Sequence, residues 1–461
     1  MDIRPQVLMV LTVGVVLPTL LCAVENGAAP PDLDAMQAQI AARLQQGDAV
    51  LAIPDANPAE ALPHYLSAYA LAEKLTAPDV TSTALNDSYN RLGELWLKLG
   101  NSAKALHCFR GALEGREKLR WRFPENTQFR LDLCSSQERL GDLYRKLGNT
   151  EKAGEHYRSG LSTFEELVEL HPEDVDLRRN LAANYERLGG FYGELGATKN
   201  AKEGGIYWDE PEYDSHPEHA QAQGYYWMAL AIREQLVKQE PRNLQLKHGV
   251  AGTFNLLGDL YGNRWRRQER VSRRKALAIA EELVKADPAN PLGWSALMST
   301  YNGMRVFAQP EDFAKPVEKG ELDRKALSAA EQLVKLDPAN RDGWECISLT
   351  SMNLGARLEE SDDLVQAREF YLKILVASET LAKLVKESGD DYRLQVGAAC
   401  ERLGRLAEKQ GEIPEAILRY EQVLDIWTKR FQEDPYTPWV RSGLEEAQAT
   451  LYRLRTGRPP K

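Results

Sequence analysis

A chain of 461 residues with 43% hydrophobic and 27% charged residues has the composition of a folded protein rather than of a disordered one. Its formal net charge of −10 argues against non-specific attraction to nucleic acid or to an anionic membrane. The length would fit several ordinary domains, but a repeating pattern that covers most of the chain makes such a division unnecessary.

Residues 1–24 have the layout of a secretory leader. One arginine precedes an almost unbroken apolar run at residues 7–24, and a cleavage site is expected near Ala23. An uncleaved membrane anchor formed by residues 7–24 remains the alternative, because a run of this length just spans a bilayer. A lipoprotein signal at Cys22 is disfavoured, since Leu21 precedes it where a small residue is needed. We therefore expect an exported protein, either periplasmic or extracellular.

The segment after the leader is predicted to be a linker followed by a degenerate helix pair. Residues 25–32 (ENGAAPPD) form the expected linker, and residues 33–46 and 59–75 form the two helices. Ala61, Tyr65 and Ala68 recur at helical spacing and are expected on the buried face of the second helix.

A ten-residue segment then recurs along the chain. It reads RLGELWLKLG at residues 91–100, RLGDLYRKLG at 139–148 and RLGGFYGELG at 187–196, with weaker copies at 256–262 and 402–411. The anchor glycines Gly93, Gly141 and Gly189 are 48 residues apart, and Gly258 and Gly404 occupy the same place in the weaker copies. A fixed period of this kind indicates a solenoid.

Each copy predicts one helix and implies a second. The apolar positions of the first unit are Tyr89, Leu92, Gly93 and Trp96 on one helix, then Ala105, Phe109 and Ala112 on the next. Gly100 is expected to end the first helix, and Gly93 is expected to let the paired helix approach closely. Two helices cannot bury both stripes alone, so neighbouring pairs must stack.

These residues resemble tetratricopeptide repeats, of a bacterial protein. The resemblance implies an all-α, right-handed superhelix, here of about eight helix pairs plus a capping helix, which recognises other proteins. The chain departs from the family in the length of its unit, which is about 34 residues in the family and 48 here. The extra turns are expected at the end of the second helix, before Pro124 and Pro172.

The fourth pair is predicted to carry an insertion at about residues 202–221, because Ala222 takes a place expected at Ala201. Tyr207, Trp208 and Tyr213 lie there among acidic residues, whereas the next connection, residues 264–275 (RWRRQERVSRRK), is strongly basic. We expect the acidic insertion to lie against this basic segment; the alternatives are two independent solvated surfaces, or an anion or acidic-peptide site. The arginines of this predicted edge basic patch are Arg264, Arg266, Arg267, Arg270, Arg273 and Arg274.

The later units close the array. Residues 276–290 and 326–340 resemble each other more than the rest, and both lead into a Gly-Trp pair. The helical array is expected to extend over residues 33–436. Residues 437–461 are then a capping helix with a charged face, followed by a tail.

No motif of an enzyme is present: the sequence lacks a P-loop, a G-x-G-x-x-G after a strand, H-E-x-x-H and G-x-S-x-G. His216 and His219 are expected in an exposed polar loop, and no metal or cofactor is expected. The cysteines after the leader are interpreted as small apolar residues of the core. A disulfide between Cys108 and Cys134 stays open, because exported proteins can form one.

The resemblance also indicates a binding groove, formed by first-helix residues three before and one after each anchor glycine. The predicted groove residues are Asn90, Glu94, Glu138, Asp142, Glu186, Asn255, Asp259, Glu401 and Arg405. Most are acidic or amide-bearing, so a basic or polar peptide is favoured over a terminal carboxylate; the alternative is a groove that only keeps the array soluble.

We therefore predict a non-catalytic scaffold or adaptor of the cell envelope. It would bind a protein or peptide through the groove or through the edge formed by the long connections. The alternative is a recognition subunit of an enzyme or signalling complex whose catalytic chain is separate. Contact with nucleic acid, or with a membrane beyond the leader, is not expected.

Overall fold

The computed structural model describes residues 33–53, 57–75, 83–202, 217–262, 265–307, 319–384, 392–433, 436 and 438–457. All the elements in these ranges are helices. They are α2 (Leu33–Ala52), the short 3-10 helix η2 (Pro58–Ala61), α3 (Leu62–Leu75), α4 (Thr83–Lys98), α5 (Ser102–Arg122), α6 (Thr127–Lys146), α7 (Thr150–Leu170), α8 (Val175–Lys202), α9 (Pro217–Gln239), α10 (Leu244–Tyr261), α11 (Arg266–Ala286), α12 (Pro291–Phe307), α13 (Lys319–Leu336), α14 (Arg341–Glu360), α15 (Leu364–Leu384), α16 (Tyr392–Lys409), α17 (Ile413–Glu433) and α18 (Pro438–Thr456).

The turn inside a pair is set by a glycine and an asparagine. Gly100 and Gly148 adopt positive φ angles of 73° and 76°, which end α4 and α6 in the left-handed conformation that glycine accepts readily. Asn101 then caps α5, because its side-chain oxygen accepts a hydrogen bond of 3.1 Å from the backbone N–H of Lys104. The expected ends of these helices are confirmed.

The anchor glycines lie against a large side chain of the second helix. A Cβ atom on Gly93 would lie 2.5 Å from the ring of Phe109, and one on Gly141 would lie 2.5 Å from the ring of Tyr157. The rings of Tyr226, Tyr371 and Tyr420 cover Gly189, Gly355 and Gly404 in the same way. The predicted close approach of the paired helices is therefore confirmed. The first pair shows the same contact, because Gly47 of α2 lies against the ring of Tyr65 of α3.

The two central pairs replace this contact with charged side chains. Gly258 lies under the guanidinium group of Arg273, which also covers Gly303 of the following pair. In that same following pair, formed by α12 and α13, Arg305 stands where an anchor glycine is expected, and its Nε lies 3.4 Å from Oδ1 of Asp323. Both Arg273 and Asp323 are buried, so the centre of the array is held by ion pairs where the other repeats have rings.

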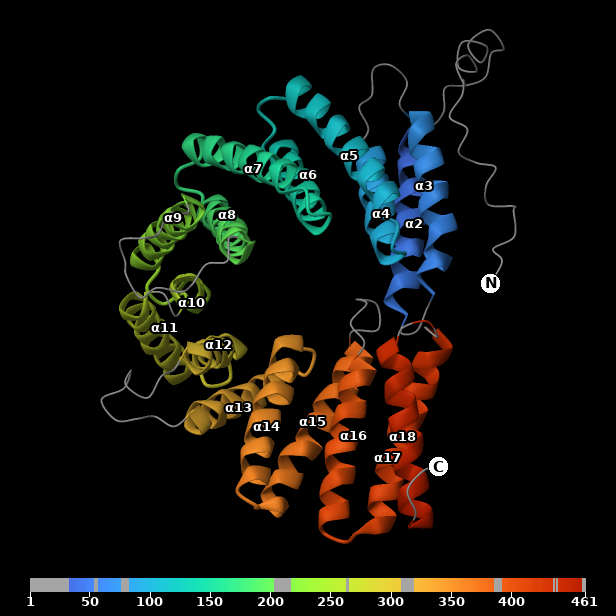
Figure 1. The fold of residues 1–461 in the computed structure, drawn as a ribbon. Helices are drawn as coiled ribbons and strands as arrows, with labels where there is room; N and C mark the ends of the chain where they lie inside the picture. Colours follow the sequence, from blue (N-terminus) through green and yellow to red (C-terminus); the bar gives the residue numbers. More distant parts are fainter. Residues whose placement is uncertain are drawn as a thin grey trace.

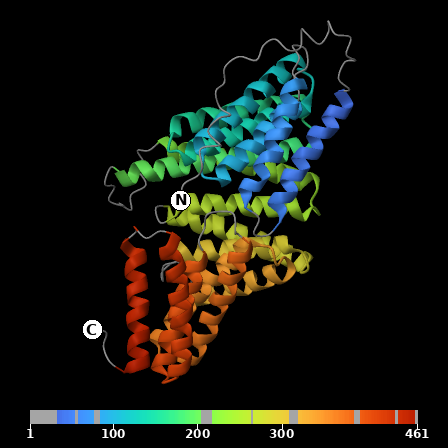
Figure 2. The ribbon, with the colours of Figure 1, turned by 90° about the vertical axis from the view of Figure 1, so that its right-hand side faces the viewer.

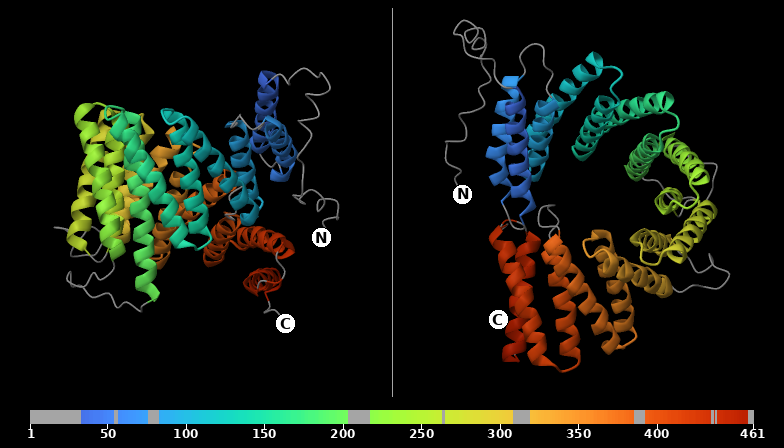
Figure 3. Two further views of the ribbon diagram at one scale, coloured as in Figure 1. Left: turned by 90° about the horizontal axis from the view of Figure 1, so that it is seen from above. Right: turned by 180° about the vertical axis from the view of Figure 1, so that it is seen from behind.

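The pairs stack into a right-handed superhelix (Figure 1). The first helices α6, α8, α10 and α12 lie on the inner side of the curve, and the second helices α7, α9, α11 and α13 lie on the outer side. The N-terminal pair and the C-terminal helices return to one side of the molecule, but they are displaced along the superhelix axis (Figures 2 and 3). The predicted fold class is confirmed.

Each of the second helices α5, α7, α11, α15 and α17 has 21 residues. The α5 helix reaches Arg122 and α7 reaches Leu170, so the extra turns lie before Pro124 and Pro172, as predicted. The first helix of the array is longer than expected, because α2 continues to Ala52 and includes Gly47.

One local prediction was wrong, at His219, and two points that the sequence left open are resolved for the described residues. The insertion is partly helical, since α8 runs to Lys202 and α9 begins at Pro217; Tyr207, Trp208 and Tyr213 lie outside the described residues. His219 is buried in α9, where its ring lies against Gly196, so it does not belong to an exposed loop. His216 is outside the described residues. The cysteine pair predicted as an open alternative is not bonded: Cys108 and Cys134 are both free and buried.

Candidate interaction surfaces

An ion-pair ladder joins the first helices of the N-terminal half, and two of the predicted groove residues, Glu94 and Asp142, belong to it. The residue after Gly47, Gly93 and Gly141 is acidic, and in each case it pairs with the arginine two places before the next anchor glycine. Asp48 lies 3.2 Å from Arg91, Glu94 pairs with Arg139, and Asp142 lies 2.9 Å from Arg187. The arginines of the three links, Arg91, Arg139 and Arg187, are 48 residues apart, and each is the first residue of an RLG segment.

Tyrosines of the second helices complete two of these links. The hydroxyl of Tyr65 donates to Asp48 over 2.7 Å, and that of Tyr157 donates to Asp142 over 2.6 Å. Burial first, and then the hydrogen bond to a carboxylate, raise the pKa of both tyrosines above the usual range. The ring that covers the anchor glycine therefore also fixes the carboxylate that pairs with the following repeat.

A related arrangement continues at the C-terminal end. Glu359 accepts a hydrogen bond from Tyr371 over 2.8 Å and from Lys409 over 2.6 Å, and it lies 3.7 Å from Arg402. Burial and the bond to Glu359 raise the pKa of Tyr371 to about 12. Glu408 in turn lies 2.5 Å from Arg453 of α18, so the capping helix is joined to the array by the same chemistry.

The remaining predicted groove residues are also paired. With the side-chain oxygen of Asn90 turned toward Arg116, it accepts hydrogen bonds from both terminal nitrogens of that guanidinium group, over 2.7 and 3.0 Å. Glu138 lies 3.5 Å from Arg187, and Glu186 lies 2.6 Å from Arg233. Asn255 donates to Thr300 over 3.0 Å and accepts from Arg273, which also holds Asp259. Glu401 and Arg405 pair with each other on α16, 3.1 Å apart.

The surface that carries the ladder is therefore not a free acidic surface. Its carboxylates alternate with guanidinium groups, and the ladder side chains of Asp48, Arg91, Glu94, Arg139, Asp142 and Arg187 are all partly exposed. A partner on this face meets hydrogen-bond donors and acceptors of both charges in a fixed, regular order.

The arginines of the predicted edge basic patch do not share one exposed surface. Residues from Arg266 onward form the first turns of α11 rather than a connection, and Arg264 lies outside the described residues. Arg267 and Arg274 are exposed, whereas Arg273 has only 1% of its surface accessible. The prediction was wrong for Arg273, because this side chain fills the core position that a ring fills elsewhere.

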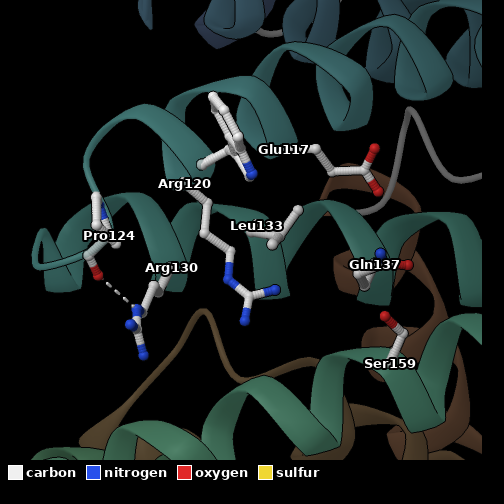
Figure 4. Close-up of a pocket in the computed structure, with 8 residues that line it drawn as sticks. Glu117, Arg120, Pro124, Arg130, Leu133, Gln137 and Ser159 are labelled. Atoms are coloured by element: carbon white, nitrogen blue, oxygen red, sulfur yellow. Dashed lines mark hydrogen bonds between the residues drawn. The ribbon is translucent and has the colours of Figure 1, made fainter.

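Two clefts lie between neighbouring second helices, and neither was predicted. The first cleft, of about 630 Å³, is bounded by α5 and α7 with α6 as its floor (Figure 4). Its lining residues are Glu117, Arg120, Trp121, Pro124, Arg130, Leu133, Gln137 and Ser159. The second cleft, of about 320 Å³, lies over α14 between α13 and α15 and is lined by Glu331, Val334, Trp344, Ile347, Glu369, Leu372, Lys373 and Val376.

The two clefts are the same place in two repeats. Their lining residues match at a separation of 214 positions, as in Glu117 and Glu331, Leu133 and Ile347, and Ser159 and Lys373. In the second cleft Lys373 reaches across to Glu331 and forms an ion pair. Ser159 is too short to reach Glu117 in this way, which leaves the first cleft open.

The residue four places before the anchor glycine marks where a cleft is left open. This position holds Tyr89 and Tyr185 in two repeats. Tyr89 packs edge-to-face on Tyr69, with ring centroids 5.0 Å apart, and Tyr185 stacks on Tyr225, with ring centroids 6.1 Å apart. Gln137 takes the position beside the first cleft, and Ser351 takes it beside the second. The repeat register therefore contained a signal for the clefts.

Within the described residues, no group of three or more His, Cys, Asp or Glu side chains could hold a metal ion. None of the described helices combines the length and apolar character that crossing a membrane requires.

Two parts of the chain match the family described as tetratricopeptide repeat, at residues 135–167 and 399–429. These ranges fall on the pairs α6–α7 and α16–α17. No curated protein matches the chain in sequence. These two pairs are therefore tetratricopeptide repeats, a fold that suggests a role in protein–protein interaction, and the resemblance seen in the sequence is confirmed there.

Solved structures of similar architecture have low identity. BtubC from P. vanneervenii is 20% identical, with 66% of this chain and 92% of that chain covered and a TM-score of 0.34. The apo form of RapI is 13% identical, with 75% and 99% covered and a TM-score of 0.40. The C-terminal part of a TPR repeat-containing protein from Cytophaga hutchinsonii is 13% identical, with 77% and 98% covered and a TM-score of 0.33. These values indicate nothing about the partner of this chain.

Proposed function

We propose that this array of tetratricopeptide repeats is a non-catalytic scaffold of the cell envelope that holds a partner protein on its inner face. The observation that carries the proposal is the ion-pair ladder on the first helices, from Asp48 to Arg187. It is a pre-formed polar surface that repeats at the spacing of the helix pairs, and a rigid surface of this kind loses little conformational freedom on binding.

The partner segment that fits this surface carries charges of both signs. Each exposed ladder pair contributes only about 0–1 kcal/mol to the fold, so a ligand that takes over one member of a pair costs the scaffold little. Many such exchanges along several repeats add up to specificity, because a segment with the wrong order of charges meets like charges. Binding through these pairs weakens as salt is added.

The test compares two charge-reversed variants that differ only in the face they change. The inner-face variant carries Glu94→Lys and Asp142→Lys. The control carries Glu114→Lys and Asp425→Lys, which remove acids of exposed pairs on the second helices α5 and α17 and change the net charge equally. Tagged chains are used to capture proteins from an envelope extract of the organism that encodes the chain. We expect the captured partner to be lost with the inner-face variant and kept with the control.

Equal capture by both variants would contradict binding on the inner face. Location in the envelope has its own test, which is fractionation of the cells and sequencing of the mature amino terminus. Recovery of the chain from the cytosol with residues 1–24 intact would contradict export.

A further inference from the structure

The last turn of α5 exposes a large aromatic side chain that nothing in the described structure covers. Trp121 has 89% of its surface accessible, although tryptophan is usually well buried. It stands in the part of α5 that makes this repeat longer than the family unit. Exposed tryptophans of this kind commonly act as anchors that enter a pocket on a partner.

The first cleft lies directly beside Trp121. Leu133 gives its floor an apolar part, and Gln137, Ser159 and Glu117 give it groups that can accept a hydrogen bond from an indole N–H. The guanidinium group of Arg120 extends into the cleft (Figure 4), where it lies 2.8 Å from Glu166. A guanidinium group at this place can also lie over an aromatic ring. The volume of about 630 Å³ exceeds what one indole needs, so flanking atoms fit as well.

We propose that two copies of this chain pair by inserting Trp121 of each into the first cleft of the other. A projecting side chain and a cleft that lie side by side on one patch are self-complementary about a two-fold axis, and such an interface closes after two copies. With the two α5 helices antiparallel across the axis, Glu117 of one copy faces Arg120 of the second copy. This pairing goes beyond the proposed scaffold function, since it leaves both inner faces free.

The second cleft lacks the features that the pairing uses. There Lys373 fills part of the cleft with its ion pair to Glu331, the volume is about 320 Å³, and the position of Trp121 is taken by Lys335. The interface is small, so a dissociation constant in the micromolar range is expected.

The experiment is sedimentation equilibrium of the chain without residues 1–24 at concentrations from about 1 to 300 µM. Trp121→Ala is expected to weaken the dimer about tenfold for each tryptophan removed, and therefore roughly hundredfold overall. Tyr436→Ala is the matched control, because Tyr436 is another projecting aromatic residue, 92% exposed, at the far end of the chain. This control is expected to dimerise as the unchanged chain does.

A second variant closes the cleft and keeps the tryptophan. Ser159→Lys places at the first cleft the residue that closes the second, opposite Glu117, and Ser159 is exposed, so the change is compatible with the fold. This variant alone is expected to be monomeric. A mixture of Ser159→Lys and Trp121→Ala chains has one tryptophan and one open cleft that match, so the mixture is expected to associate more than either variant alone.

The proposal would be overturned by an unchanged chain that stays monomeric up to 300 µM, or by a dimer that persists in Trp121→Ala. A mixture that associates no more than its separate components would also overturn it. Insertion of Trp121 into the cleft predicts that the mixture, which contains one matching tryptophan and one open cleft, associates more. Thermal unfolding of each variant verifies that these outcomes do not come from loss of the fold.

Discussion

Single glycines decide how closely the helices of a pair can pack, and the chain offers a matched comparison. Gly141 of α6 lies against the ring of Tyr157, where an added Cβ would come within 2.5 Å of the nearest ring atom. Gly224 lies inside α9, and a Cβ there would meet nothing within 4 Å. The two glycines have the same helical backbone preference and differ only in the space around them.

Alanine is therefore expected to have opposite effects at these two glycines. Gly141→Ala forces the Tyr157 ring to move, and overpacking of this kind costs about 1–3 kcal/mol, which exceeds the gain of about 1 kcal/mol in helix propensity. Gly224→Ala keeps that gain and stabilises the chain by about 0.5–1 kcal/mol. Urea unfolding followed by circular dichroism measures both, and a stabilising Gly141→Ala would contradict the close packing.

Arg273 is the residue whose removal is expected to cost most. Its guanidinium group pairs with Asp259 and lies 3.4 Å from the buried Glu269. Arg273→Leu leaves these carboxylates without that partner, and breaking a buried pair costs about 3–5 kcal/mol. The double variant Arg273→Leu with Glu269→Leu is expected to recover a large part of the loss, measured as a coupling free energy by urea unfolding. A simple sum of the two single effects would contradict an energetic role for the pair.

The sequence could place the glycines but not this arginine. The spacing from Gly93 to Phe109 and from Gly141 to Tyr157 predicted the ring contacts directly. Arg273 stands in a run of arginines, so its composition indicated an exposed patch. The register held the contrary signal, because Ala276 follows Arg273 by three residues as Ala112 follows Phe109.

Between elements, burial decides how much an ion pair stabilises the stack. The side chains of Glu94 and Arg139 are more than a third exposed, whereas those of Glu186 and Arg233 are largely buried. Arg233 also holds Glu186 through two hydrogen bonds, of 2.9 and 2.6 Å.

Glu94→Gln is therefore expected to change the free energy of unfolding by less than about 1 kcal/mol. Glu186→Gln removes a carboxylate from a nearly buried guanidinium group and is expected to cost at least about 2 kcal/mol. Thermal or urea unfolding of the two variants gives the comparison. Similar small effects would mean that solvent screens both pairs alike.

The junction of α6 and α7 is expected to respond to pH through His156. Its Nδ1 lies 2.6 Å from Oε1 of Gln137, and its ring stacks on Tyr144. Burial, with Arg110 and Lys152 nearby, lowers the pKa of His156 below its usual 6.5. The unfolded chain then binds a proton that the folded chain does not, so stability falls as the pH falls below about 6.5. Glu155 opposes this shift without reversing its direction.

His156→Gln is expected to reduce that loss of stability between pH 6.5 and 5.5, measured as the change in Tm across the window. Part of the loss of stability is expected to remain in this variant, because burial also lowers the pKa of His248. His171→Gln is the control for the substitution itself, because His171 has an exposed side chain just after α7. An unchanged slope in His156→Gln would contradict the role of this junction.

The limits of helices were predictable where glycine and asparagine follow each other, and not where tertiary contacts decide. Gly100 and Gly148 end their helices as expected. Gly196 has the same place in its repeat, yet α8 continues through it. Here the missing side chain of Gly196 makes room for the ring of His219. The sequence shows the glycine in both cases but not which contact uses it.

At the scale of the whole molecule, each pair packs mainly on its neighbours, so the ends of the array need protection. The capping helix α18 supplies it at the C-terminal end. Ala447 packs into a cluster with Cys400 and Val423, and Gly443 lies on the ring of Trp427. Arg453 and Arg455 add ion pairs to Glu408 and Glu421.

Removal of residues 437–461 is therefore expected to weaken the array locally rather than as a whole. Val423 and Trp427 would face water, and α16 and α17 would lose amide protection against hydrogen exchange, while α6 to α9 keep theirs. Hydrogen exchange measured by mass spectrometry resolves these regions on one sample. A uniform loss of protection from α4 to α17 would mean that the repeats unfold as a single cooperative unit. The central ion pairs at Arg273 and Asp323 would then couple the two halves more strongly than packing between neighbouring pairs implies.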